Sequence, residues 1–252
     1  MRVRVLIGVL SALALATVAS AADVPVVKSP WEGFGVGSWA HHKKLSKWTG
    51  LSMPDMAEET RQTVVKVTDD AYTIKTEKKT TAGWESAGES PSSRRAAAIS
   101  PPDDGSGPKV ESEDLGTEKI TVEGKAFECK KVRTKIGESI TTTWTSQTHG
   151  VLKTDSDNDA GGGKTHDIRT VTAFAKRVKL AGKELVCRET TLFTKMDLPG
   201  MPSGTAHDGT TGVLLESDAV PGRKVRVETL GSGGPVTMTS VEELVAFEAK
   251  PP

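Results

Sequence analysis

Alternating apolar and polar residues occupy nearly all of the chain after its first 22 residues. In the segment 61–78, Val65 and Val67 share one face of an extended backbone, and Tyr72 and Ile74 follow a turn at two consecutive aspartates. Val, Ile and Thr at a period of two favour half-buried antiparallel strands, and a short polar turn favours a hairpin. Helical periodicity is nearly absent, so the sequence predicts an all-β protein. The same pattern recurs at 140–146, 150–154, 167–174, 223–230 and 235–247.

An internal repeat predicts how these strands are arranged. Residues 120–131 (ITVEGKAFECKK) align without a gap on residues 178–189 (VKLAGKELVCRE), so that a Gly-Lys pair and a cysteine recur 58 positions later. Each unit predicts a strand, a tight turn, a strand with an inward-facing cysteine and further antiparallel strands. Because sequential antiparallel strands usually pair with their neighbours, we expect a curved antiparallel sheet or half-open barrel built from duplicated β-meander units.

Composition divides the chain into regions. Residues 86–116 are rich in Ser, Pro, Gly and charge, and cannot bury enough apolar area to offset the entropy of ordering them. The sequence therefore predicts a disordered loop or linker there. The segment 86–116 follows a Trp-rich strand and hairpin region at 23–85. The duplicated region covers 117–252, with units near 117–175 and 176–248, and is expected to form one domain with 23–85.

The first 22 residues have the pattern of a secretory signal peptide. Arg2 and Arg4 precede an apolar stretch at 5–19, and small residues follow at Ala19 and Ala21. The apolar stretch is shorter than the roughly 20 residues that cross a bilayer, and no cysteine lies near the cleavage point to carry a lipid. We therefore expect a soluble exported protein, periplasmic or extracellular, with no membrane span and no lipoprotein anchor.

Charge and motif content exclude several functions. The 33 basic and 33 acidic residues are balanced and form no basic block, which argues against nucleic-acid binding. No G-x-S-x-G, P-loop or H-E-x-x-H motif occurs. The five histidines lack partners at diagnostic spacing, so the sequence predicts no catalytic residue and no enzyme. They are His41, His42, His149, His166 and His207.

Alternating aspartates form a weak candidate for a calcium site. Asp155, Asp157 and Asp159 match the first half of a calcium-binding loop, in which carboxylates converge on a hard cation. Ala160 then replaces the glycine of the turn, and His166 stands where a bidentate glutamate should close the shell. A solvated hairpin loop is the favoured interpretation. No other cofactor is indicated.

The two cysteines allow two interpretations. Cys129 and Cys187 both face inward by the period-two pattern, and an oxidising compartment favours a disulfide between them. Equivalent strands of two adjacent units are, however, several strands apart at ~4.8 Å each, whereas a disulfide needs Cα atoms within ~7 Å. A disulfide and two buried free thiols therefore both remain open.

Aromatic residues concentrate near the start of the chain, because six of the eleven lie before residue 85. This clustering favours coverage of one end of the sheet, and a ligand-binding face including Trp31, Phe34, Trp39 and Trp48 is the sharper alternative.

The segment from Pro30 to Trp39, PWEGFGVGSW, carries a resemblance. With the two "GK…C" units and Trp144, it resembles a group of secreted bacterial all-β proteins that open with P-W-x-x-F-x-x-G-S-W. That group has no established activity, so the resemblance implies an exported β protein and no catalytic residue. More distantly, the strand-rich pattern is similar to the half-barrels of periplasmic lipoprotein carriers, whose concave face holds acyl chains.

Together these features predict a secreted, non-catalytic β protein that binds a hydrophobic ligand or an envelope protein on its sheet. One alternative is a metal-assisted or hydrolytic enzyme using Asp155, Asp157, His166 and His207. Another is an envelope structural module that self-associates through an exposed sheet edge. The oligomeric state is left open.

Overall fold

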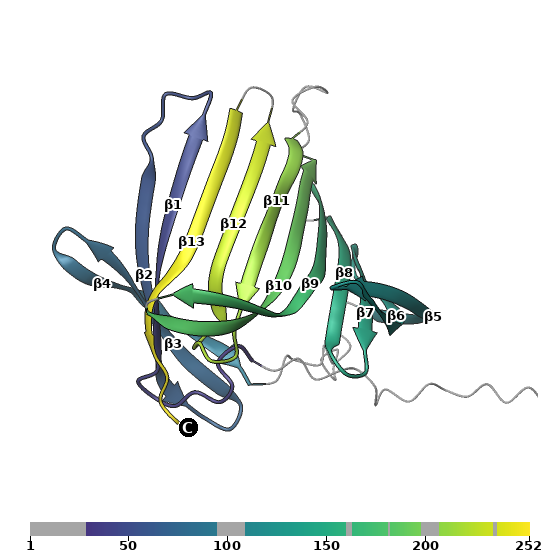
Figure 1. Cartoon of the computed structure of the whole chain (residues 1–252), viewed down its shortest axis with the longest axis horizontal. Coiled ribbons are helices and arrows are strands. Elements are labelled where there is room, and N and C mark those ends of the chain that lie inside the picture. The colour runs from purple at the N-terminus through teal and green to yellow at the C-terminus, as the bar shows by residue number, and fades with distance from the viewer. Residues whose placement is uncertain (1–28, 95–108, 160–162, 181, 198–206, 234–235) are drawn as a thin grey trace, which may run out of the picture.

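The computed structural model describes residues 29–94, 109–159, 163–180, 182–197, 207–233 and 236–252. In these residues 13 strands form one antiparallel sheet and no helix occurs (Figure 1), which confirms the predicted all-β class. The described residues accordingly contain no helix long and apolar enough to cross a membrane. The predicted signal peptide, 1–22, lies outside the described residues. The strands are β1 (Trp39–Thr49), β2 (Met56–Val67), β3 (Ala71–Thr80), β4 (Gly83–Ser93), β5 (Val110–Val122), β6 (Lys125–Ile136), β7 (Ser139–Ser146), β8 (Gly150–Asp159), β9 (Lys164–Leu180), β10 (Lys183–Asp197), β11 (His207–Glu216), β12 (Lys224–Gly233) and β13 (Val236–Glu248).

The strand order places the first strand beside the last in the middle of the sheet. It runs β4-β3-β2-β1-β13-β12-β11-β10-β9-β8-β7-β6-β5. Every neighbouring pair except β1 and β13 is consecutive in sequence, as the meander prediction requires. The first strand pairs with the last from Trp39 opposite Glu248 to Thr49 opposite Thr237. The edges are therefore β4 and β5, which follow each other in sequence but do not pair, so the sheet is open. Figure 1 shows that it is also curved.

The prediction of a disordered segment at 86–116 is wrong at both ends of that segment. Residues 86–93 belong to β4 and residues 110–116 to β5, while 95–108 lie outside the described residues. The side chains of β4 are mostly exposed, as the composition indicated. The strand forms nevertheless because its backbone pairs with β3 from Ala71 opposite Ser93 onward. Backbone hydrogen bonds do not depend on apolar side chains.

The longest hairpin, β9–β10, folds over one side of the sheet. Its register shifts around Cys187, Glu189 and Thr190, and bulges of this kind bend a strand. Figure 1 shows the tip crossing the lower ends of β11, β12 and β13. The Lys183 ammonium, at the tip, lies 4.3 Å from the ring centre of Phe247 in β13. We call the side of the sheet onto which this tip folds the hairpin face.

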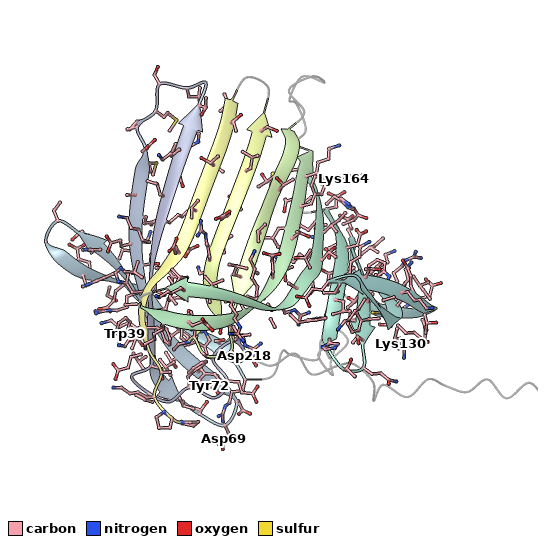
Figure 2. The ribbon with its side chains drawn as sticks, viewed as in Figure 1. Trp39, Asp69, Tyr72, Lys130, Lys164 and Asp218 are labelled. Atoms are coloured by element: carbon pink, nitrogen blue, oxygen red, sulfur yellow. The ribbon has the colours of Figure 1, made fainter. Side chains whose placement is uncertain are left out.

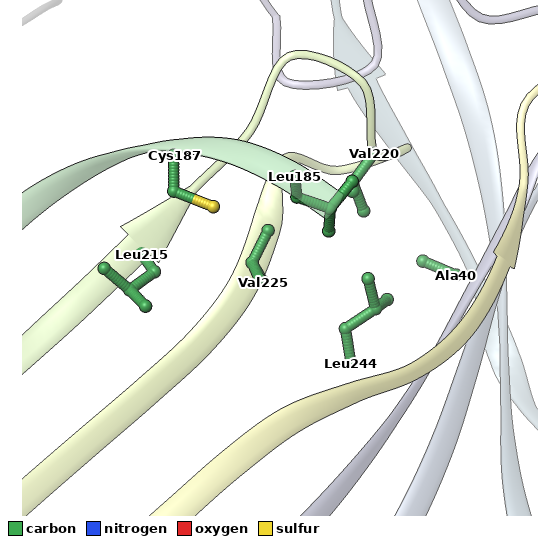
Figure 3. Close-up of a cluster of buried hydrophobic side chains, with 7 residues drawn as sticks. All are labelled: Ala40, Leu185, Cys187, Leu215, Val220, Val225 and Leu244. Atoms are coloured by element: carbon green, nitrogen blue, oxygen red, sulfur yellow. The ribbon is translucent and has the colours of Figure 1, made fainter. Parts of the chain in front are cut away.

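Side chains of the tip close the main core. Leu185 and Cys187 point from β10 towards Val225 and Leu244, as Figure 3 shows. Burying side chains of this size is worth roughly 1.5–3 kcal/mol each. The tip therefore attaches to the sheet through apolar contact. The buried members of this cluster are Ala40, Leu185, Cys187, Leu215, Val220, Val225 and Leu244.

The other repeated segment has the same local structure in a separate core. The β5–β6 hairpin turns at Glu123 and Gly124, both with positive φ, and the β9–β10 hairpin turns at Gly182, also with positive φ. Cys129 then lies in a second cluster, as Cys187 lies in the first. The buried members of that second cluster are Ile120, Val122, Cys129, Trp144, Leu152 and Val171.

Of the two interpretations of the cysteines, the structure shows free thiols. Cys129 and Cys187 are both fully buried and unpaired. Each belongs to a different hydrophobic cluster. Burial raises the pKa of both thiols, which keeps them in the unreactive neutral form. The cysteines therefore serve as core side chains.

A buried histidine couples the stability of the main core to pH. His42 is 2% exposed, and its Nε2 lies 2.9 Å from the carbonyl oxygen of Lys224, to which a neutral imidazole can donate. Burial lowers the pKa of His42 below its usual 6.5. As pH falls through the unfolded value, the unfolded chain takes up a proton that the folded chain resists, so stability is lost.

We expect the melting temperature to fall between about pH 7 and about pH 5, and to fall less in His42→Gln, whose amide still donates but does not titrate. Lysine hydrogen bonds lower the pKa of Glu58, Glu59 and Glu77 below 4.5, so their contribution is lost only at lower pH. Thermal denaturation of both proteins across this range measures the difference. Equal slopes would show that His42 is not responsible.

Candidate functional site

A pocket of about 360 Å³ opens at the end of the hairpin face away from the β9–β10 tip. Five of its lining residues form one row across five strands. Trp48 of β1 lies opposite Met238, Met238 opposite Gly231, Gly231 opposite Thr210, and Thr210 opposite Thr194. Cross-strand partners project from the same face of a sheet. The strand register therefore assembles this site, which we call the rim pocket.

The lining of the rim pocket is mainly apolar. Its volume lies within the roughly 300–1,000 Å³ typical of small-molecule sites. None of the lining residues carries an ionisable side chain, so a charged ligand group would find no partner in the pocket. The lining residues are Trp48, Leu51, Thr194, Met196, Gly209, Thr210, Gly231, Ser232, Val236 and Met238.

Gly231 keeps the floor of the pocket open. A Cβ atom at this position would lie 3.0 Å from the Thr210 hydroxyl oxygen. Any side chain here would therefore project from β12 into the pocket, between side chains of β11 and β13. Glycine within a strand commonly marks a place where another group approaches the backbone closely. Nearby, the Thr194 hydroxyl donates to a carboxylate oxygen of Asp167 at 2.6 Å, which holds that side chain in place.

Polar residues bound the pocket on the side nearer the core. Ser46 lies two residues before Trp48 and therefore on the same face of β1. Its hydroxyl donates to Ser240 of β13 at 3.3 Å. Both serines are buried, at 8% and 7% exposure. The next pair on this face is Lys44 opposite Glu242, and Glu242 pairs with Lys224. An apolar ligand therefore has room only between the serines and the open end.

The predicted ligand face is only partly assembled here, because Trp48 alone among its four members lines the pocket. Trp31 and Phe34 are 5% and 7% exposed. Trp39 donates through Nε1 to Glu248 at 3.1 Å. Figure 2 shows Trp39 near the start of β1 and Tyr72 below it. Trp31 packs with Tyr72 in a third cluster, together with Val64 and Ile74.

The PWEGFGVGSW segment instead joins the residues before β1 to the residues that follow β13. The Gly35 amide donates to the carbonyl of Lys250 at 2.9 Å, and the Lys250 amide donates to the Ser38 hydroxyl at 2.9 Å. A Cβ atom at Gly35 would overlap the carbonyl oxygen of Pro251. The Trp31 ring lies against Gly222, where a Cβ would be 3.1 Å away. Most of these aromatic residues therefore have a structural role.

The aspartates of the calcium candidate lie on a strand. Asp155, Asp157 and Asp159 belong to β8, where alternate residues are ~6.8 Å apart, too far to converge readily on an ion bound at 2.3–2.6 Å. His166 of β9 lies 2.8 Å from Asp157 and 3.7 Å from Asp155, measured from Nδ1. In the described part of the chain, no group of three His, Cys, Asp or Glu residues could hold a metal ion.

The residues of the enzyme alternative are only partly brought together. His166 meets two aspartates in an open surface cluster on β8 and β9. His207 begins β11, with its backbone opposite Gly233, and its side chain lies outside the described residues. Of the four residues, Asp155, Asp157 and His166 therefore lie together on two neighbouring strands.

Comparison with known proteins gives little further information. No protein-family model matches the chain, and no curated protein matches its sequence. Among solved structures the chain is similar to a Bacteroides fragilis protein described as a candidate exported protein with a YmcC-like fold. The TM-score is 0.34 and the sequence identity 9%, over 88% of this chain and 100% of that chain. At this level of similarity a shared activity does not follow.

Proposed function

We propose that this is a non-catalytic, exported binding protein that holds the aliphatic chain of a hydrophobic ligand in the rim pocket. The observation that carries the proposal is the pocket itself, an apolar hollow of about 360 Å³ built by five strands and free of ionisable side chains. Export is supported by the signal-like pattern of residues 1–22.

The chemistry of the lining favours an aliphatic chain over a polar ligand. Met196 and Met238 supply flexible thioether side chains that adapt to irregular apolar shapes. Trp48 adds a large flat apolar surface beside Met238. The Thr194 hydroxyl already donates to Asp167, which leaves few polar groups to orient a ligand. Binding energy must therefore come mainly from removing apolar surface from water.

A series of straight-chain alcohols tests this proposal. Each buried methylene group contributes roughly 0.8 kcal/mol, so affinity should rise by up to about fourfold per carbon until the pocket is filled. Isothermal titration calorimetry with hexanol, octanol and decanol measures the rise. Decane-1,10-diol is the matched control, because its second hydroxyl would be buried without a partner and should weaken binding. Absence of binding, or affinity independent of chain length, would refute the proposal.

A further inference from the structure

Exposed apolar side chains lie at the rim pocket and in the chain segment beside it: Leu51 and Met196 line the pocket, and Met53 and Met56 follow Leu51 in the sequence. Nine large apolar residues are exposed among those that the structure describes. Four of them lie in the connection between β1 and β2, at the start of β2, or near the end of β10: Leu51, Met53, Met56 and Met196, at 47%, 46%, 56% and 45% exposure. We call these four residues the apolar rim. The other five are Val36, Ile140, Val186, Leu230 and Val245.

The apolar rim and the pocket form a continuous surface. Leu51 and Met196 both line the pocket and are nearly half exposed. They approach the mouth from the β1–β2 connection and from β10, which are on opposite sides of the row of five strands. A ligand entering between them would pass from one apolar surface directly to another.

We propose that the apolar rim docks on a lipid bilayer, from which the ligand enters the pocket. This inference rests on the proposed function, because a ligand with a long aliphatic chain partitions into an apolar phase and must be collected there. Exposed apolar patches that continue into a site commonly mark interaction surfaces. Leu and Met side chains can enter the boundary between headgroups and acyl chains without leaving a polar group unpaired.

The composition of the rim favours a lipid surface over a protein partner. Its four members are aliphatic or thioether side chains, whereas the residues that dominate binding at protein interfaces are mainly Trp, Tyr and Arg. Beside the loop that carries Leu51 and Met53, Lys47 lies 3.5 Å from Asp55, so these two opposite charges offset each other. The docking force is therefore apolar burial, and it should depend only weakly on salt.

Vesicle flotation tests the docking. The full-length mature protein is mixed with vesicles of phosphatidylethanolamine and phosphatidylglycerol, and the bound fraction is measured after centrifugation. We expect the double variant Leu51→Asp with Met53→Asp to bind at least about tenfold more weakly, because two apolar side chains no longer enter the bilayer. Met196→Asp, on the other side of the mouth, should weaken binding in the same direction.

Leu230→Asp is the matched control. Leu230 is 49% exposed, close to the value for Leu51, but it precedes Gly231 in β12 and therefore projects from the opposite face. Its flotation should equal that of the unmodified protein. No flotation of the unmodified protein, or equal loss in the rim and control variants, would overturn the inference. So would a dimer in light scattering that the rim variants dissociate, since a second copy would then cover the rim.

Decanol titration separates the docking inference from the proposed function. Decanol binding without flotation would refute docking alone. Flotation that depends on the rim, without decanol binding, would refute the proposed function and leave a membrane-docking surface. Thermal melting of each variant confirms that it is folded before either measurement is interpreted.

Discussion

Replacing Gly231 with leucine is expected to weaken decanol binding by about sixtyfold or more while leaving the sheet folded. The leucine side chain would project into the rim pocket and occupy space otherwise filled by three or more ligand methylene groups, at roughly 0.8 kcal/mol each. The Cβ atom would lie 3.0 Å from the Thr210 hydroxyl oxygen, the end of a side chain that can rotate away. Titration calorimetry measures the affinity and urea denaturation measures the stability.

Thr239→Leu is the control for added bulk. Thr239 is exposed and lies opposite Leu230 and Lys47, next to Met238 on β13 but on the other face of the sheet. Decanol should bind this variant as it binds the unmodified protein. Undiminished binding to Gly231→Leu would place the ligand outside the rim pocket.

Replacing Leu185 with alanine is expected to lower the free energy of unfolding by about 2–5 kcal/mol, the range for removing a buried leucine. Leu185 is 4% exposed and attaches the β9–β10 tip to Val225 and Leu244. Val225 belongs to β12, two places from β10 in the sheet order, and Leu244 to β13, three places away. The substitution therefore weakens a contact between strands that are not paired with each other. Urea denaturation at neutral pH measures the change.

Val186→Ala is the control for the tip. Val186 follows Leu185 in β10 but is 55% exposed, so its truncation should change stability by less than about 0.5 kcal/mol. Similar losses in both variants would show that the tip does not rest on the sheet through Leu185. A loss of unfolding free energy in Leu185→Ala well below about 2 kcal/mol would also show that Leu185 does not hold the tip on the sheet.

Local patterns in the sequence predict most of the strands but only part of their arrangement. Alternation and the Gly-Lys turns place the β5–β6 and β9–β10 hairpins and turn both cysteines inward. The pairing of β1 with β13 joins residues about 200 positions apart, from Trp39 opposite Glu248 to Thr49 opposite Thr237. No local pattern marks such a pair, because it depends on how the whole meander curves.

The candidate site is less visible in the sequence for a related reason. Trp48 is among the predicted ligand residues, but Met196, Gly231 and Met238 are not. They come together only because β10, β11, β12 and β13 pair in sequence order and in one register. Gly231 directly follows the alternating run 223–230 in the sequence and is typical of a turn there, whereas the structure continues β12 through it to Gly233. The aromatic character of Trp31 and Phe34 suits a ligand-binding face, but in the structure both are buried packing residues.

Crystallography with a bromine-labelled ligand tests the central claim most directly. Crystals of the protein grown with 10-bromodecan-1-ol would be measured at the bromine absorption edge, where anomalous scattering locates the bromine atom without reference to the rest of the ligand. If the ligand chain occupies the rim pocket, the anomalous peak lies among Trp48, Met238 and Gly231. A fully occupied peak elsewhere on the protein, or a ligand that binds in solution but leaves this pocket empty, would contradict it.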